Sequence, residues 1–158
     1  MTDSQIEYQL RYGVQFIDEL GDGKDGDVLE TSRGYAVKFL HDEGVYNREV
    51  RAYEILGSLD IGDIDGFQIP RMRRHDDSLR AIEMTIVRPP FIIDFAAAYT
   101  EEEYEQFEFT EEVLEERENH WSEVFGDKWP AVRTLCQKFT GRTGLVLLDL
   151  SLNNIRFA

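Results

Sequence analysis

The first half of the chain alternates between short β-rich runs and turns rich in glycine and aspartate. From Val14 onward the runs "VQFIDEL", "DVLET" and "YAVKFL" predict three antiparallel strands. The next segment, "YNREVRAYEILGSL", has apolar residues at every third position and predicts a helix of about three turns. "FQIPRMRRH" and "LRAIEMTIV" predict two further strands, the first weakened by Pro70. We therefore expect a five-stranded antiparallel sheet with one helix inserted after the third strand.

The second half has the apolar spacing of helices. Residues 101–118 contain ten glutamates, and apolar side chains recur there and just beyond at helix-like intervals: Tyr104, Phe107, Leu114, Trp121 and Val124. "PAVRTLCQKFTG" predicts another helix that ends at Gly141 and carries one apolar stripe: Val132, Leu135, Cys136 and Phe139. The strand-like run "GLVLL" follows. Pro89 and Pro90 mark the passage between the halves.

This pattern predicts an α+β fold in three parts. Residues 1–13, with Ile6 and Leu10 at helical spacing, form a lead-in; residues 14–88 form a strand-rich lobe; residues 89–158 form a helical part. A chain of 158 residues with 42% hydrophobic content has enough apolar surface for one compact core.

Charge and cysteine content narrow the function classes. With 17 basic and 32 acidic side chains the net charge is −15, which disfavours nucleic acids and anionic membranes as partners. No apolar run reaches the roughly 18 residues of a membrane span, and "MTDSQIEYQL" does not resemble a signal peptide, so we expect a cytoplasmic protein. The single cysteine, Cys136, is expected to be a core thiol, and the histidines lack metal-ligand spacing: His41, His75 and His120.

A glycine motif stands between the first two predicted strands. In "LGDGKDGDV", Gly21, Gly23 and Gly26 satisfy G-x-G-x-x-G. A dinucleotide-binding loop would open a helix at this point, whereas the residues that follow are strand-like. The motif therefore fits either a hairpin turn that covers phosphate groups or an ordinary turn of glycine and aspartate.

From Leu20 to Lys38 the sequence reads L-G-x-G-x-x-G-x-V and then A-V-K, which resembles the N-terminal lobe of the protein-kinase-like family. The resemblance implies that ATP binds here, with Leu20, Val28 and Ala36 around the adenine and Lys38 on the α- and β-phosphates. It also implies a carboxylate that fixes Lys38. Glu49 fits that role best, and Glu54 competes on the same helix.

The resemblance extends to a hinge and a catalytic loop. It places Met84 near the gatekeeper position and Thr85 to Val87 at the hinge that pairs with the adenine edge. Near the chain's end, "DLSLNN" matches the family's D-L-x-x-x-N, which makes Asp149 the residue that accepts or orients the acceptor's proton and Asn154 a Mg²⁺ ligand.

Several positions depart from the family pattern. Leu147 and Leu148 replace its His and Arg, and Ser151 stands where many members have a lysine that faces the phosphates. The family's D-F-G triplet, whose Asp holds Mg²⁺, follows the catalytic loop and would lie beyond Ala158. The metal site is therefore expected to be incomplete, in a natural short form or a fragment.

Three functions remain open at this point. The resemblance implies a serine/threonine-type phosphotransferase in its complete form, inactive or impaired as this chain. A pseudokinase and a small acidic protein-interaction module are the alternatives. The glutamate-rich segment fits either a solvated helical face or an acidic surface that would favour cationic acceptors, such as basic peptides or amine-bearing small molecules. Because no later helices would cover the apolar stripe, we also expect self-association or partner binding through residues 130–158.

Overall fold

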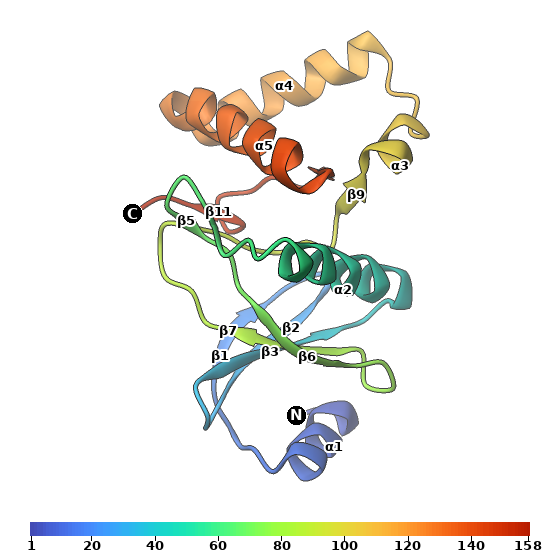
Figure 1. The fold of residues 1–158 in the computed structure, drawn as a ribbon, viewed down its shortest axis with the longest axis vertical. Coiled ribbons are helices and arrows are strands. Elements are labelled where there is room, and N and C mark those ends of the chain that lie inside the picture. Colours follow the sequence, from blue (N-terminus) through green and yellow to red (C-terminus); the bar gives the residue numbers. More distant parts are fainter.

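The computed structural model describes the whole chain from Met1 to Ala158 (Figure 1). Its main sheet is antiparallel, has the order β1-β2-β3-β7-β6, and consists of β1 (Phe16–Asp22), β2 (Gly26–Thr31), β3 (Tyr35–Leu40), β6 (Met72–Asp76) and β7 (Ala81–Thr85). Helix α2 (Glu43–Ser58) follows β3 and begins earlier than predicted, because the Asp42 side chain accepts a hydrogen bond from the Val45 amide. The predicted α+β fold, with a five-stranded antiparallel sheet and one helix inserted after its third strand, is confirmed.

The two faces of the sheet are covered by different helices, as Figure 1 shows for α1 (Asp3–Tyr12) and α2. Side chains alternate along β3, so that Val37 and Phe39 pack with Tyr8 of α1, while Ala36 and Leu40 join the core beneath α2. Ile6 and Leu10, the apolar pair noted in the sequence, are instead exposed. The lead-in thus packs through the buried Tyr8, whose hydroxyl donates to the Glu83 carboxylate.

The acidic segment forms two helices instead of one. Helix α3 (Glu101–Glu105) ends before residue 106, and Thr110 then caps α4 (Glu111–Phe125) by accepting a hydrogen bond from the Val113 amide. A short 3₁₀ turn, η1 (Gly126–Lys128), leads into α5 (Trp129–Thr143). Helix α5 ends at Gly144 in the left-handed conformation (φ 71°), not at Gly141 as predicted.

Short strands pair the end of the chain with segments that come earlier in the sequence. The order β11-β8-β5-β4 joins β4 (Asp63–Ile64), β5 (Phe67–Gln68), β8 (Phe91–Ile92) and β11 (Ile155–Arg156). A separate pair joins β9 (Ala98–Thr100) to β10 (Leu145–Leu147). The last residues of the chain therefore lie against residues 91–100.

One core of 23 buried residues runs from the inner face of the sheet through α2 to α5 and β11. Val132, Leu135 and Phe139 are at most 2% exposed, and the Phe139 ring stacks on Phe95 with centroids 5.8 Å apart. The expectation that this stripe stays uncovered is wrong, because residues earlier in the chain cover it. The reason for expecting self-association through residues 130–158 is thereby removed.

None of the helices combines the length and the apolar character that crossing a membrane requires.

Candidate functional site

Lys38 is the centre of the candidate site. It projects from the middle of β3, and its Nζ lies 2.8 and 3.1 Å from the two carboxylate oxygens of Glu49 and 2.8 Å from Oδ1 of Asp94. The side chains of Lys38 and Glu49 are 8% and 1% exposed, whereas that of Asp94 is 26% exposed. Glu54, the competing glutamate on α2, points to solvent. An ammonium group is thus held between one buried and one partly exposed carboxylate.

Burial and the neighbouring charges have opposite effects on the pKa values of Lys38 and Glu49. Desolvation alone would lower the pKa of Lys38, but the carboxylates of Glu49 and Asp94 outweigh it and raise that pKa above its usual value. Burial raises the pKa of Glu49 to about 7, against the opposing effect of Lys38. Lys38 therefore stays protonated, and its ammonium group stabilises the ionised form of Glu49.

Asp94 is a candidate site residue that the sequence did not suggest. It opens the triplet Asp94-Phe95-Ala96, separated from the end of β8 by one residue, and its backbone is left-handed (φ 68°). Non-glycine residues are uncommon in that conformation and persist where their surroundings fix them. Asp94 therefore brings a carboxylate to Lys38 from a segment that precedes the predicted catalytic loop, a contact that the sequence did not suggest.

Strand pairing brings the predicted catalytic loop to Asp94. Ile155 of β11 pairs with Ile92 of β8, and the Ile93 amide donates to the Asn154 carbonyl at 2.8 Å. Asn154 is in turn fixed by its amide, which donates to Ser151. The structure thus places Asn154 beside the segment that carries Asp94. The side chain of Arg117, from α4, donates to the Leu148 carbonyl at 3.1 Å and so helps to fix the start of the loop.

Negative charge accumulates around Asp149. Partial desolvation, together with the carboxylates of Asp94 and Asp25, raises the pKa of Asp149, and Lys24 opposes this. A raised pKa suits a group that accepts a proton from an acceptor hydroxyl. The mutual repulsion of these carboxylates would also be relieved by a bound cation.

The oxygen-bearing side chains near Asp94 could bind Mg²⁺ only together with oxygen atoms of a bound ligand. No cluster of three or more histidine, cysteine, aspartate or glutamate side chains is arranged to hold a metal by itself. Mg²⁺ commonly binds one or two carboxylates and completes its shell with phosphate oxygens and water. Asp94, which contacts Lys38, and Asn154, whose side chain contacts the Asp149 carbonyl, are oxygen-bearing side chains that could contribute to such a shell.

The predicted nucleotide residues come to one face of the sheet, with one exception. Val28 lies opposite Lys38 in the β2–β3 ladder and packs, like Ala36, on the inner core. Leu20 is 43% exposed and lies outside that core. Val28 and Ala36 thus share the face that carries Lys38, whereas Leu20 does not join them.

The three glycines of the motif differ in how much space surrounds the position that a Cβ would occupy. A Cβ on Gly26 would lie 2.1 Å from the Phe39 carbonyl oxygen, so close strand packing already requires glycine there. A Cβ on Gly21 would meet open space, and one on Gly23 would make only an ordinary contact. The Gly23 amide already donates to the Gly26 carbonyl at 3.1 Å, so it holds the turn closed.

The predicted hinge lies at the end of β7. Met84 is buried, and its sulfur accepts a hydrogen bond from the Tyr53 hydroxyl. Thr85 is the last residue of β7, and its Oγ1 accepts from the Arg71 amide. Val87 follows in the connector and is half-buried. These positions border the inner face that carries Ala36 and Lys38.

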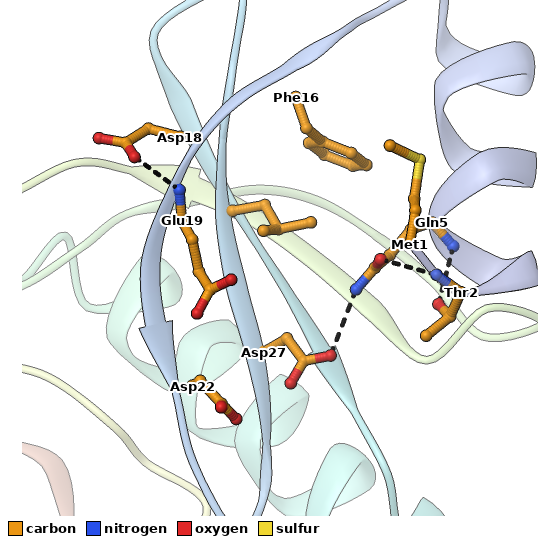
Figure 2. A pocket seen from close by; sticks show the side chains of 9 residues that line it. Met1, Thr2, Gln5, Phe16, Asp18, Glu19, Asp22 and Asp27 are labelled. Atoms are coloured by element: carbon orange, nitrogen blue, oxygen red, sulfur yellow. Dashed lines mark hydrogen bonds between the residues drawn. The ribbon is translucent and has the colours of Figure 1, made fainter.

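The cavity drawn in Figure 2 lies elsewhere, between α1 and strands β1 and β2. It has a volume of about 390 Å³, and its lining includes four carboxylates: Asp18, Glu19, Asp22 and Asp27. Gln5 donates to Asp27 across it. Four negative charges would repel a triphosphate, so this cavity is not the nucleotide site.

Cys136 provides a test of the packing of α5. Burial raises the pKa of its thiol to about 12. The thiolate is the reactive form, so at about pH 8 the native thiol should react with Ellman's reagent at least about a hundredfold more slowly than in the urea-unfolded chain. Rapid stoichiometric labelling of the native protein would mean that α5 does not pack as described.

Comparisons with known proteins add distant structural likenesses. No protein-family model matches this chain, and no curated protein matches it. The streptomycin–ATP–APH(2'')-IIa ternary complex is similar over 78% of this chain and 38% of its own, with 18% identity and a TM-score of 0.45. The aminoglycoside phosphotransferase APH(2'')-Ib, ADP-bound, is similar over 96% and 42%, with 17% identity and a TM-score of 0.47. For the gentamicin–APH(2'')-IIa complex the values are 97% and 42%, 17% and 0.48.

This chain thus spans 38 to 42% of the length of those structures. Identities and TM-scores this low do not bear on its substrate or activity.

Proposed function

We propose that this chain is a kinase-like phosphotransferase that binds ATP with Mg²⁺ and passes the γ-phosphate to a hydroxyl acceptor. The observation that supports this most directly is the Lys38 ammonium held 2.8 Å from both Glu49 and Asp94. Asp149 and Asn154 lie on the adjoining loop. A buried lysine fixed by a helix glutamate, next to an aspartate and a D-L-x-x-x-N loop, is the donor set that phosphoryl transfer needs.

Each residue has a role that follows from its surroundings. Lys38 would contact the α- and β-phosphates, and Glu49 would keep the ammonium in place. Asp149, with its raised pKa, would accept the proton of the acceptor hydroxyl. Asp94 and Asn154 would hold Mg²⁺, which neutralises charge on the phosphates when bound.

The acceptor class is a finer part of the proposal. The net charge of −15 and the glutamates of α3 and α4 favour a cationic acceptor, either a basic peptide with serine or threonine or an amine-bearing small molecule with a hydroxyl. No residue of the site selects between a protein and a small molecule.

Calorimetric titration with ATP and Mg²⁺ tests the proposal. We expect Lys38→Ala to weaken ATP binding at least about tenfold, because the phosphates lose their cationic contact. Transfer of labelled phosphate to a basic protein or to an amine-bearing small molecule should fall about a hundredfold or more in Asp149→Asn. Equal affinity of wild type and Lys38→Ala would contradict the nucleotide site. Binding without transfer would indicate a pseudokinase, and no binding would indicate an acidic interaction module.

A further inference from the structure

Helix α2 is tied to the segment that follows Asp94 at two positions flanking Glu49. Arg48 Nε donates to the Ala96 carbonyl at 3.0 Å, and its guanidinium lies 5.1 Å from the centre of the Tyr99 ring. Arg51 donates to both carboxylate oxygens of Glu103, at 2.6 and 2.8 Å, and makes a longer contact of 3.4 Å to the Ala98 carbonyl. Residues three apart on a helix share a face, so one side of α2 is fastened to residues 96–103.

Glu103 is itself held in a defined position. It is the third residue of α3, and its Oε2 also accepts a hydrogen bond from the Thr100 amide in a capping box. The hydrogen bonds from Arg51 lower the pKa of Glu103 to about 2. The pair therefore stays charged at every pH at which a cytoplasmic enzyme works, and its geometry is bidentate.

We propose that Arg51 and Glu103 are positioning residues for the phosphotransfer site. This inference rests on the proposed function. The pair fixes α2 relative to the segment of Asp94, and it thereby sets the position from which Glu49 reaches Lys38. Because the anion is a glutamate of the chain itself, this arrangement needs no phosphorylation to form. That agrees with the leucine at position 148, where the family pattern has the arginine that would pair with a phosphorylated loop.

If the pair of Arg51 and Glu103 had only a structural role, its loss would have little effect on Lys38. The side chains of Arg51 and Glu103 are 33% and 36% exposed, and pairs with that exposure contribute little to stability. Loss of the pair should thus shift the melting temperature by no more than about 2–4 °C. A positioning role predicts a much larger effect at Lys38.

The test compares Arg51→Gln and Glu103→Gln with Glu105→Gln, a matched exposed glutamate on the same helix that forms no ion pair. One readout is the rate at which an amine-reactive reagent labels Lys38 in the nucleotide-free protein, followed by mass spectrometry. The other is kcat and KM for ATP. We expect both pair variants to label Lys38 about tenfold faster and to lose about tenfold in kcat, with a smaller change in KM. Arg51→Lys, which keeps the charge but not the bidentate geometry, should be intermediate.

Labelling and kcat equal to those of Glu105→Gln would overturn the inference. Labelling does not require activity, so the inference can fail separately from the proposed function. If wild type did not bind ATP, the proposed function would fall, while faster labelling in the pair variants would still support the positioning of Lys38 and unchanged labelling would reject it.

Discussion

Asp94→Asn is expected to lower phosphate transfer by about a hundredfold or more and to abolish the effect of Mg²⁺ on nucleotide affinity. The substitution keeps the shape of the side chain but removes the anionic oxygen that would bind the metal. Loss of one preorganised electrostatic contact typically costs a factor of about 10² to 10³ in rate. Lys38 retains its contacts with Glu49, so the fold should persist.

Calorimetric titration of ADP with and without Mg²⁺ measures this directly, beside the rate of transfer. Asp60→Asn is a matched control, because Asp60 also has a left-handed backbone (φ 51°) and also forms an ion pair, with Arg71 at 2.8 Å. The control should keep both the rate and the Mg²⁺ dependence. If Asp94→Asn kept them as well, the metal would be held by other carboxylates, with Asp149 one candidate.

The strand-rich half was predictable because its signals are local. Alternating runs separated by turns of glycine and aspartate predicted the strands. The contact between Lys38 and Glu49 was implied by the resemblance to the protein-kinase-like family, not by the local pattern. The N-terminal helix was less predictable. Its packing depends on polar side chains such as Tyr8 and Tyr12, which reach Glu83 on β7 and Asp76 on β6, and nothing in the local pattern points to those contacts.

Asp94 was not predicted because the order of segments along the chain was taken as fixed. The triplet Asp94-Phe95-Ala96 is visible in the sequence, after the short apolar run "FII", but it precedes the catalytic loop. An antiparallel pair such as β8 and β11 forms equally well whichever strand comes first in the chain. Proximity in space therefore does not require the family's order in sequence.

The same assumption explains the error about the apolar stripe of α5. Only the acidic helix and later segments were considered as partners for the stripe, whereas the ring that stacks on Phe139 belongs to Phe95, in the triplet that begins with Asp94. One segment, residues 91–100, thus supplies both a candidate metal ligand and the cover for the helical core. A D-F pair after a short apolar run was the signal that could have revealed both.

Lys38→Met is expected to destabilise the fold by about 3 kcal/mol at about pH 8 and much less at about pH 5. Methionine matches the length of the lysine but leaves Glu49, which is fully buried, without its cation. Removing one partner of a buried ion pair commonly costs about 3–5 kcal/mol, because an uncompensated charge remains. Asp94 is more exposed and can be solvated, so most of the effect should arise from Glu49.

The pH dependence follows from the direction of the pKa shift of Glu49. Burial raises that pKa to about 7 even with Lys38 present, whereas in the unfolded chain it is near 4.5. Between these values the folded state binds a proton that the unfolded state has lost, so unfolding free energy falls as pH rises, by about 1.4 kcal/mol per pH unit. Without Lys38 the folded pKa rises further, so the decline continues above pH 7 in the variant after it has ended in wild type.

Urea unfolding of wild type and variant at about pH 5, 7 and 8.5, without nucleotide, measures the difference. Lys38→Met/Glu49→Leu is the control, because it removes the buried charge together with its partner and should recover much of the lost stability at high pH. A loss of stability that was the same at every pH, or that persisted fully in the double variant, would show that Lys38 contributes through packing. In that case Glu49 would be neutral in the folded wild type, and its contact with Lys38 would be an ordinary hydrogen bond instead of the ion pair on which the proposed site depends.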